Sequence, residues 1–258
     1  MIRKWTKFPY ADAAYAYDAA GLKKHWGRLH RGDCETLPKS GDALEAWRLF
    51  HAGEFGAAVE RGRAAGGAAM NAAIKAQGIY AHYLEKSEQT RLALFEEAAQ
   101  WADARRAEAP KDANAHYLYA FTLGRYGQGI SIAKALAQGF GGKIREALTT
   151  ALKLQPKHAE AHTAYGAYHA EVIGKMGALV GGVTYGAKKD AAVEHYETAI
   201  KLHPESAIAR TEYANGLLLL FGKSRLADAE KLYQAASECR PMDAMERLDV
   251  EHARAELD

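Results

Sequence analysis

Apolar residues recur three and four positions apart along most of the chain, and the segments that carry them stop at prolines. The stretches AVEHYETAIKLHP (192–204) and AEKLYQAASECRP (229–241) show the pattern most plainly. This is the period of an amphipathic α-helix, and proline cannot continue one. A half-buried strand needs alternating apolar and polar residues rich in β-branched or aromatic types, and the sequence offers no such run. The pattern predicts an all-α fold.

The helical segments also repeat one another. Counting back five and eight positions from each of three prolines gives a small residue and then a large one, and the twelfth position is small in two of the three copies. The triplets are Ala151, Leu148 and Ile144 before Pro156; Ala199, Tyr196 and Ala192 before Pro204; and Ala236, Tyr233 and Ala229 before Pro241. Small residues let paired helices approach closely, and large ones fill the space between them. Self-similarity over a few tens of residues indicates stacked helical units.

A tyrosine followed by a small residue returns in register after three of the prolines. The pairs are Tyr119–Ala120, Tyr165–Gly166 and Tyr213–Ala214. Together with the positions before the prolines, this spacing resembles the tetratricopeptide repeat (TPR), a helix–turn–helix unit of about 34 residues. The resemblance covers about residues 42–241 and implies a helical-repeat solenoid of about five helix pairs.

Two of the units are longer than the family's period. Successive prolines lie 46, 48 and 37 residues apart, so two units exceed the usual length by about 12 to 14 residues. Aligning the helices that follow places the additions between the two helices of a unit, within Gly124–Lys143 and Ile173–Lys189. The expected organisation is one TPR-like domain over 1–258, with an N-terminal cap over 1–41, repeats over 42–241, inserts near 127–142 and 173–187, and a C-terminal capping helix over 242–258.

Both ends of the chain carry amphipathic segments of the kind that cover the end faces of a solenoid. A short helix is expected near the N-terminus and a charged helix at the C-terminus. The side chains expected to face inward are Leu22, Trp26 and Leu29 in the first and Met245, Leu248 and Val250 in the second. Both segments are therefore interpreted as caps.

The two inserts are rich in glycine and apolar residues and poor in charge, unlike ordinary exposed loops. We therefore expect both to fold back and bury their apolar side chains. The residues concerned are Ile130, Ile132, Leu136 and Phe140 in the first insert and Met176, Leu179, Val180 and Tyr185 in the second. Two interpretations stay open. Either the inserts seal gaps between units or one end of the array, or they line a pocket or pore for a small ligand.

Long TPR units with Gly-rich extensions are also similar to those of bacterial proteins related to the eukaryotic regulators of microtubule dynamics. A further similarity is to the accessory TPR subunits of tripartite (TRAP) substrate transporters. Those subunits are exported lipoproteins, whereas the first residues of this chain carry no apolar run of signal-peptide length. A cytoplasmic bacterial protein is therefore expected rather than a periplasmic transport component.

Charge and cysteine content narrow the choice of partner and compartment. Lys and Arg total 34 against 32 Asp and Glu, a formal charge of +2 without a long run of one sign, which does not favour nucleic acid or an acidic membrane surface. The longest apolar stretch, Leu217–Phe221, is far too short to cross a bilayer. Cys34 and Cys239 lie near opposite ends, offer no metal-ligand or redox pair, and suit a reducing compartment.

Histidines are the main candidates for chemistry. His158, His162 and His169 lie at helical spacing on one face with Tyr165, and a metal ion could use such a stripe. However, His162 and His169 occupy positions that TPR units give to interhelical packing, so buried, hydrogen-bonded histidines are the favoured interpretation. The stripe is not His-Glu-x-x-His, and the sequence contains no Walker-type loop and no Gly-x-Ser-x-Gly elbow. We expect no enzyme activity, no metal site and no cofactor.

The TPR resemblance implies a concave groove lined by first-helix positions that lie between the packing positions. These positions map to Asn114, Tyr117, Phe121, Arg125, Glu160, Thr163, Glu171, Thr211 and Asn215. Arg125 can pair with a carboxylate and Asn215 can bond a peptide backbone, but the lysines of the family's two-carboxylate clamp are missing. The predicted function is a non-catalytic scaffold that binds a protein or peptide. The alternative is a protein that binds an apolar or mixed small molecule in a pocket lined by the inserts.

Overall fold

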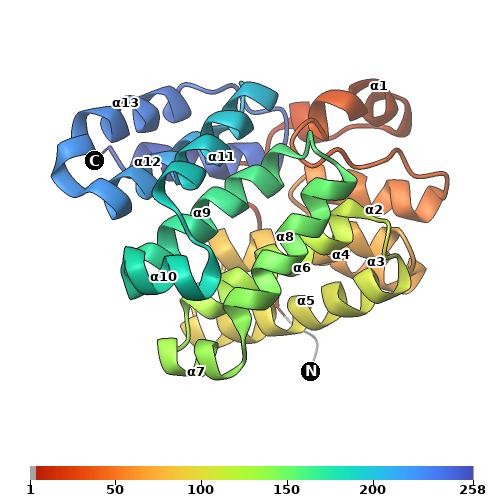
Figure 1. Ribbon diagram of the computed structural model, residues 1–258. Coiled ribbons are helices and arrows are strands. Elements are labelled where there is room, and N and C mark those ends of the chain that lie inside the picture. The colour runs from red at the N-terminus through yellow and green to blue at the C-terminus, as the bar shows by residue number, and fades with distance from the viewer. Residues whose placement is uncertain (1–3, 258) are drawn as a thin grey trace.

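Pairs of helices stack in chain order in the computed structural model, which describes residues 4–257 (Figure 1). Within this range there is no strand, and no helix is both long and apolar enough to span a membrane. The α-helices are α1 (Ala19–Leu29), α2 (Gly41–His51), α3 (Phe55–Ala65), α4 (Ala69–Tyr83), α5 (Glu88–Glu108), α6 (Ala113–Gln128), α7 (Ile132–Ala137), α8 (Phe140–Leu154), α9 (Ala159–Met176), α10 (Ala178–Tyr185), α11 (Lys189–Leu202), α12 (Ala207–Phe221), α13 (Leu226–Ser237) and α14 (Ala244–Ala255). Two short 3-10 helices, Ala13–Tyr15 and Gly222–Arg225, complete the regular structure of this range.

Five pairs of helices form the repeats within residues 4–257. α2 packs against α3, α4 against α5, α6 against α8, α9 against α11, and α12 against α13. The first helix of each later pair also packs on the second helix of the pair before it, as α4 does on α3 and α6 on α5. Because each unit contacts mainly its neighbours, the structure confirms the predicted all-α solenoid of TPR type.

Polar residues that follow the prolines define where several helices begin. An N-cap side chain stands two positions after a proline in four places: Asp112, His158, Ser206 and Asp243. Each accepts a hydrogen bond from a backbone N–H group of the first turn, at 2.8 Å for Asp243 Oδ1 and 3.2 Å for Ser206 Oγ. Caps of this kind stabilise a helix by about 1 kcal/mol each. The prolines therefore mark helix starts as well as helix ends.

Two glycines, Gly166 in the small position of α9 and Gly216 two residues after the small position of α12, allow both helices to meet Tyr196 of α11. The Tyr196 side chain is 1% exposed and contacts Gly166 of α9 and Gly216 of α12. A methyl group added at Gly166 would lie 2.8 Å from the ring, and one at Gly216 would lie 2.6 Å from it. Because these distances are shorter than van der Waals contact, neither position can hold a larger side chain without movement of Tyr196, and at Gly166 the small residue of the repeat pattern is a steric requirement.

Both inserts form short helices, α7 between α6 and α8 and α10 between α9 and α11. α10 follows Gly177 (φ 78°) and ends at Gly186 (φ 65°), a left-handed backbone that glycine adopts without strain. The predicted burial of the insert side chains is only partly correct. Phe140 is buried and Ile130, Met176 and Tyr185 are partly buried, whereas Ile132, Leu136, Leu179 and Val180 are exposed. Each helix is too short to do more than pack one side on its neighbours, so the other side faces solvent.

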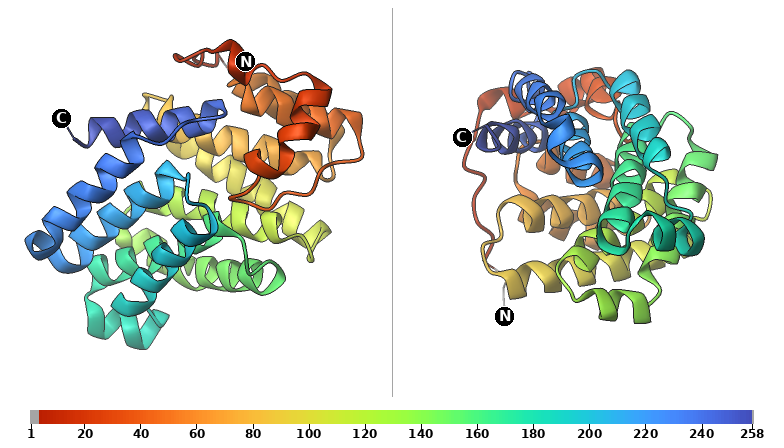
Figure 2. Two further views of the ribbon diagram at one scale, coloured as in Figure 1. Left: turned by 90° about the horizontal axis from the view of Figure 1, so that it is seen from above. Right: turned by 60° about the vertical axis from the view of Figure 1, so that its left-hand side comes forward.

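The C-terminal helix α14 does more than cover the last unit. Leu248 and Val250 are buried and Met245 is partly buried, as predicted, and α14 packs on α12 and α13. α14 also contacts α2 of the first unit, and the Tyr83 hydroxyl of α4 donates a hydrogen bond to Asp249 Oδ1 at 2.6 Å. Seen from above in Figure 2, the C-terminal helix runs beside the helices of the first units. It therefore joins the first unit to the last, a placement that the sequence did not predict.

The N-terminal cap is held by a buried chain of polar side chains. α1 buries the predicted residues Leu22, Trp26 and Leu29. His51 Nδ1 lies 2.6 Å from Asp243 Oδ2, and its Nε2 lies 3.2 Å from His30 Nε2. His30 Nδ1 in turn lies 3.0 Å from Asp33 Oδ1. These buried side chains connect the end of α1, the end of α2 and the start of α14.

Candidate functional site: a pocket on the concave side

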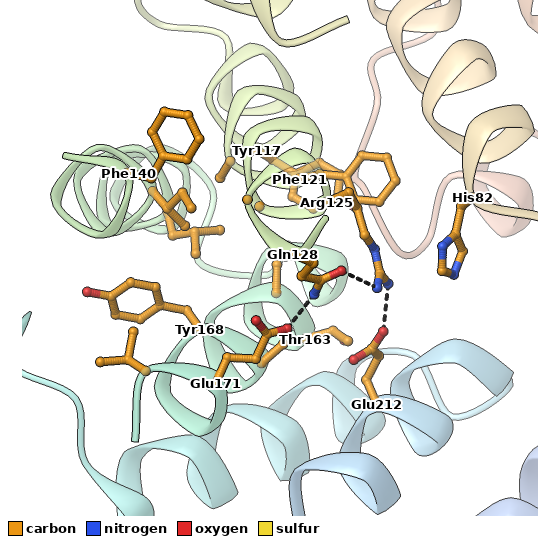
Figure 3. Close-up of a pocket in the computed structure, with 18 of the residues that line it drawn as sticks. His82, Tyr117, Phe121, Arg125, Gln128, Phe140, Thr163, Tyr168, Glu171 and Glu212 are labelled. Carbon is orange, nitrogen blue, oxygen red and sulfur yellow. Dashed lines mark hydrogen bonds and ion pairs between the residues drawn. The ribbon is translucent and has the colours of Figure 1, made fainter. Parts of the chain in front are cut away.

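A pocket of about 220 Å³ opens on the concave side of the array. Its walls come from the first helices α4, α6, α9 and α12, from α8, from both inserts and from α14. Figure 3 shows side chains of α6 and α9 facing each other across this space. Met245 and Asp249 of α14 belong to the lining, so the C-terminal helix interrupts the groove beside the pocket. The concave side therefore offers a local pocket rather than a continuous channel.

Most of the pocket wall is apolar. Tyr117 and Phe121 of α6 lie with their ring centroids 6.1 Å apart, and Ile144 of α8 and Tyr168 of α9 add to the same wall. The Phe121 ring reaches α4 because position 78 is glycine; a methyl group there would lie 2.5 Å from the ring. Burying apolar ligand surface against such a wall contributes about 25 cal/mol per Å². The wall is suited to the apolar part of a ligand.

Charged and polar side chains at the rim of the pocket are connected by hydrogen bonds. Arg125 Nη2 donates to Glu212 Oε1 at 2.7 Å, Arg125 Nη1 donates to Gln128 Oε1 at 3.2 Å, and Gln128 donates to Glu171 (Figure 3). Burial acts to lower the pKa of Arg125, but the adjacent Glu212 carboxylate outweighs it, and the pKa is raised. The side chains of Arg125 and Glu212 are 19% and 16% exposed. A ligand in the pocket can therefore reach a charged guanidinium and its partner carboxylate.

A more deeply buried ion pair borders the same pocket. Lys75 Nζ donates to Asp33 Oδ2 at 2.6 Å and to Glu160 Oε1 at 2.8 Å. Burial acts to lower the pKa of Lys75, but the carboxylates of Asp33 and Glu160 outweigh it and raise the pKa. Burial acts to raise the pKa of Asp33, but Lys75 and His30 hold it well below its usual range. Lys75 and Asp33 are therefore both charged at neutral pH.

Asn114 belongs to a buried network behind the pocket rather than to its lining. Its Nδ2 donates to the Asp33 carbonyl oxygen and to Glu35 Oε2, both at 3.0 Å. Its Oδ1 accepts from His158 Nε2 at 3.0 Å. Burial, together with the nearby carboxylates of Asp33 and Asp112, raises the pKa of Glu35 to about 8. Asn114 thus connects the loop after α1 to the starts of α6 and α9.

The structure brings six of the nine groove residues predicted from the sequence to the pocket: Tyr117, Phe121, Arg125, Glu160, Thr163 and Glu171. Asn114 is buried in the network described above, and Thr211 is completely buried. Asn215 borders a second cavity of about 230 Å³ that shares part of the lining, and its Oδ1 accepts a hydrogen bond from the Tyr233 hydroxyl at 2.5 Å. The contribution of these nine residues to binding stays a prediction.

Several pocket residues escaped the sequence reasoning. On α12, Glu212 lines the pocket in the place that was assigned to its neighbour Thr211. Lys75 could have been found, because it is the only charged residue in the stretch AMNAAIKAQGIYA (69–81) and a lone charge in an apolar helix needs a buried partner. Asp249 carries no comparable local signal, because its place at the pocket depends on where α14 packs.

The histidine stripe makes structural contacts. His158 Nδ1 caps α9, accepting from the backbone N–H three residues on at 3.0 Å. His162 Nδ1 lies 2.8 Å from His195 Nδ1, and His169 Nδ1 accepts from the Lys188 backbone N–H at 3.4 Å. Burial lowers the pKa of His169 and of His195 to about 4, so both rings are neutral at neutral pH. Across residues 4–257, no group of three or more His, Cys, Asp or Glu residues is placed to hold a metal ion.

Comparisons with known proteins agree with this architecture. Residues 71–257 match the family described as regulator of microtubule dynamics protein 1-3. Among solved structures, the chain is similar to a thermophilic TPR protein of Thermus thermophilus, with a TM-score of 0.58 and 17% sequence identity, covering 83% of this chain and 97% of that one. At this identity the likeness concerns the fold alone. No curated protein matches the sequence. The resemblances to TPR proteins and to regulators of microtubule dynamics are confirmed.

Proposed function

Since the chain belongs to the regulator of microtubule dynamics protein 1-3 family, whose members need not share one ligand, we propose its function from the pocket itself. The protein is a non-catalytic binding protein whose concave pocket takes a small ligand with an apolar body and a polar end. One observation carries the proposal: a mostly apolar wall and a partly exposed charged rim border the same cavity.

The charges of the lining indicate the character of the polar end. The lining contains three cations, Lys75, Arg125 and Lys175, and four carboxyl groups, Glu160, Glu171, Glu212 and Asp249. Burial raises the pKa of Asp249 well above its usual range, which favours its neutral form, and burial lowers the pKa of His82, which is therefore neutral at neutral pH. The lining thus carries no large excess of either charge. A neutral or zwitterionic polar end therefore fits better than a strongly anionic one.

A peptide is the second candidate, and it is favoured by one observation. Arg125 and Glu171 occupy the groove positions that the TPR fold offers to a partner, and both reach the rim of the pocket. Because α14 interrupts the groove, an extended segment has no path along the whole array. The arrangement leaves room for an apolar side chain of a peptide in the pocket, with its backbone at the rim.

Filling the pocket tests the proposal. Ala167 lines both cavities, so Ala167→Phe adds bulk there without removing a polar contact. Ala104→Phe is the matched control, because Ala104 is exposed on α5. The probe is pyrene-labelled lysophosphatidylcholine, followed by fluorescence. Losing roughly 55 Å² of apolar contact weakens binding by about 1.4 kcal/mol, or about tenfold.

The expected result is saturable binding by the unmodified chain and by Ala104→Phe, with weaker binding by Ala167→Phe. Equal affinity of both variants for the probe would reject the pocket as the site, and so would the lack of saturable binding by the unmodified chain. Selection of peptides from a displayed library addresses the second candidate. Peptides whose binding is lost in Ala167→Phe, without any binding of the probe, would favour the peptide over the small ligand.

A further inference from the structure

The two insert helices present a concentration of exposed apolar side chains. On α7 these are Ile132 (49% exposed) and Leu136 (42%), and on α10 they are Leu179 (80%), Val180 (47%) and Val183 (83%). Both helices lie at the same lower-left side of the molecule in Figure 1, and both border the concave pocket. Exposed apolar residues gathered in this way indicate an interaction surface. We call the surface formed by α7, α10 and their flanking residues the insert face.

Basic residues outnumber acidic ones around the insert face. Residues 126–145 and 172–189, which contain α7 and α10, include no Asp or Glu, although Glu146, Glu171 and Asp190 stand directly at their ends and Glu171 pairs with Lys175 at 3.0 Å. They contain six basic residues: Lys134, Lys143, Arg145, Lys175, Lys188 and Lys189. All of these except Lys189 are exposed. The near balance of charge over the whole chain conceals this local excess of basic residues.

We propose that the insert face docks on the surface of a bilayer that contains anionic lipids, without spanning it. Leu179 and Val183 would enter the region between head groups and acyl chains, while the flanking lysines contact lipid phosphates. Lysine suits this place because its flexible stem can lie along apolar surface with the ammonium group at the head groups. Both helices are short and project outward, which suits shallow insertion.

Two other occupants fit the insert face less well. A second copy of the chain would bring the same basic residues face to face, and like charges at an interface oppose association. An acidic protein would match the charge. However, two side chains at least 80% exposed on a convex helix offer no groove in which a protein segment could be held. A fluid bilayer needs no such groove.

Docking through the insert face would bring the pocket to the membrane. Ile132 and Leu136 of α7 and Tyr185 of α10 line the pocket as well as bordering the insert face. The mouth of the pocket therefore lies within the docked region. The docking surface itself does not depend on the identity, or on the presence, of a pocket ligand.

Vesicle flotation of the full chain tests the proposal. The probes are vesicles of phosphatidylcholine alone and of phosphatidylcholine mixed with phosphatidylglycerol. We expect binding only to the mixed vesicles, weakening as salt is added. Removing two exposed charges with Lys143→Gln and Lys188→Gln should weaken binding about 25-fold, since each basic residue near an anionic surface contributes roughly fivefold.

The apolar contribution is tested with Leu179→Ser combined with Val183→Ser. The matched control is Leu37→Ser combined with Leu226→Ser, because these residues are 40% and 44% exposed outside the inserts. The insert variant should lose at least about tenfold in vesicle affinity, given about 25 cal/mol per Å² of apolar surface, while the control keeps it. Circular dichroism should show that both variants remain folded, since only exposed side chains change.

Three results would overturn the proposal. They are equal binding to both kinds of vesicle, unchanged binding by the insert variant, and concentration-dependent self-association that the insert variant abolishes. Ala167→Phe separates this proposal from the pocket proposal. The variant should float with mixed vesicles as the unmodified chain does, even where it no longer binds the soluble probe. If the chain fails to bind vesicles, the docking proposal is rejected and the pocket proposal is unaffected. If the chain fails to bind the soluble probe, the pocket proposal is rejected and the docking proposal is unaffected.

Discussion

The buried ion pair between Lys75 and Asp33 makes a strong prediction about stability. The two side chains are 5% and 2% exposed, and Nζ lies 2.6 Å from Oδ2. Lys75→Met keeps most of the side-chain volume but leaves the Asp33 carboxylate with only the His30 ring and the Glu35 backbone N–H as partners. Breaking a buried pair by removing one member typically costs about 3–5 kcal/mol, because an uncompensated charge remains. We expect the free energy of unfolding to fall by this amount at neutral pH.

The loss should depend on pH in a definite direction. Burial acts to raise the pKa of Asp33, but Lys75 and His30 hold it well below its unfolded value of about 3.8. The pair therefore contributes stability that is present above the unfolded pKa and is lost as the pH falls through the native one. In Lys75→Met the burial is no longer offset, so the carboxyl group should bind a proton more readily. The difference from the unmodified chain should shrink towards acidic pH.

Urea unfolding followed by circular dichroism measures these free energies. Lys111→Met, at an exposed position, is the matched control and should change stability by no more than about 0.5 kcal/mol. Adding Asp33→Asn to Lys75→Met should recover part of the loss, because it removes the more deeply buried of the two carboxylates that lose Lys75. If the free energy of unfolding of Lys75→Met lies within about 1 kcal/mol of that of the unmodified chain at neutral pH, the reasoning is refuted, since removing one member of a buried ion pair should cost more.

Two further changes test packing and protonation. Gly166→Ala should lower stability by about 1–3 kcal/mol, because its methyl group would lie 2.8 Å from the Tyr196 ring, whose other contacts leave it little room to move. Gly27→Ala, with open space around it, is the control, and equal melting temperatures for the two variants would contradict the steric argument. Burial raises the pKa of Glu35 from 4.5 to about 8. The folded protein is therefore most stable with respect to this group below pH 4.5, where the carboxyl group is neutral, and it loses that stability as the pH rises from 4.5 to about 8. Glu35→Gln should reduce the decrease of the urea midpoint over this pH range. If the urea midpoint of the variant decreases as steeply with pH as that of the unmodified chain, Glu35 does not cause the decrease.

Much of the fold could be predicted because its signals are local. The period of the apolar residues, the prolines and the small residues of the repeat each indicate the structure of one helix or of two adjacent helices. The contact of Tyr196 with Gly166 joins α9 and α11, the two paired helices of one unit, and a repeat brings the same positions together in every unit. The domain limits, the cytoplasmic location, the bacterial origin and the lack of catalysis rest on the sequence alone and stay predictions.

The site was less predictable because it depends on long-range packing. Asn114 was assigned to the groove from its helical position, but the loop carrying Asp33 and Glu35 lies against it and uses its amide group. That loop is about 80 residues away in the sequence, and no periodicity reports its position. The exposed Leu179 was expected to be buried because it is apolar, yet α10 is too short to cover it. Hydrophobicity alone does not distinguish a core residue from an interaction surface.

The contacts of α14 change how the array should unfold. An open solenoid has two free ends, and its terminal units can detach one at a time while the middle stays ordered. Here the C-terminal helix bonds to α2 through Asp243 and to α4 through Asp249, so neither end is free. Detaching the last helix also removes partners from the first two units. We therefore expect the array to unfold more cooperatively than an open solenoid, because residues about 170 to 190 positions apart are in contact, and such distant contacts slow folding.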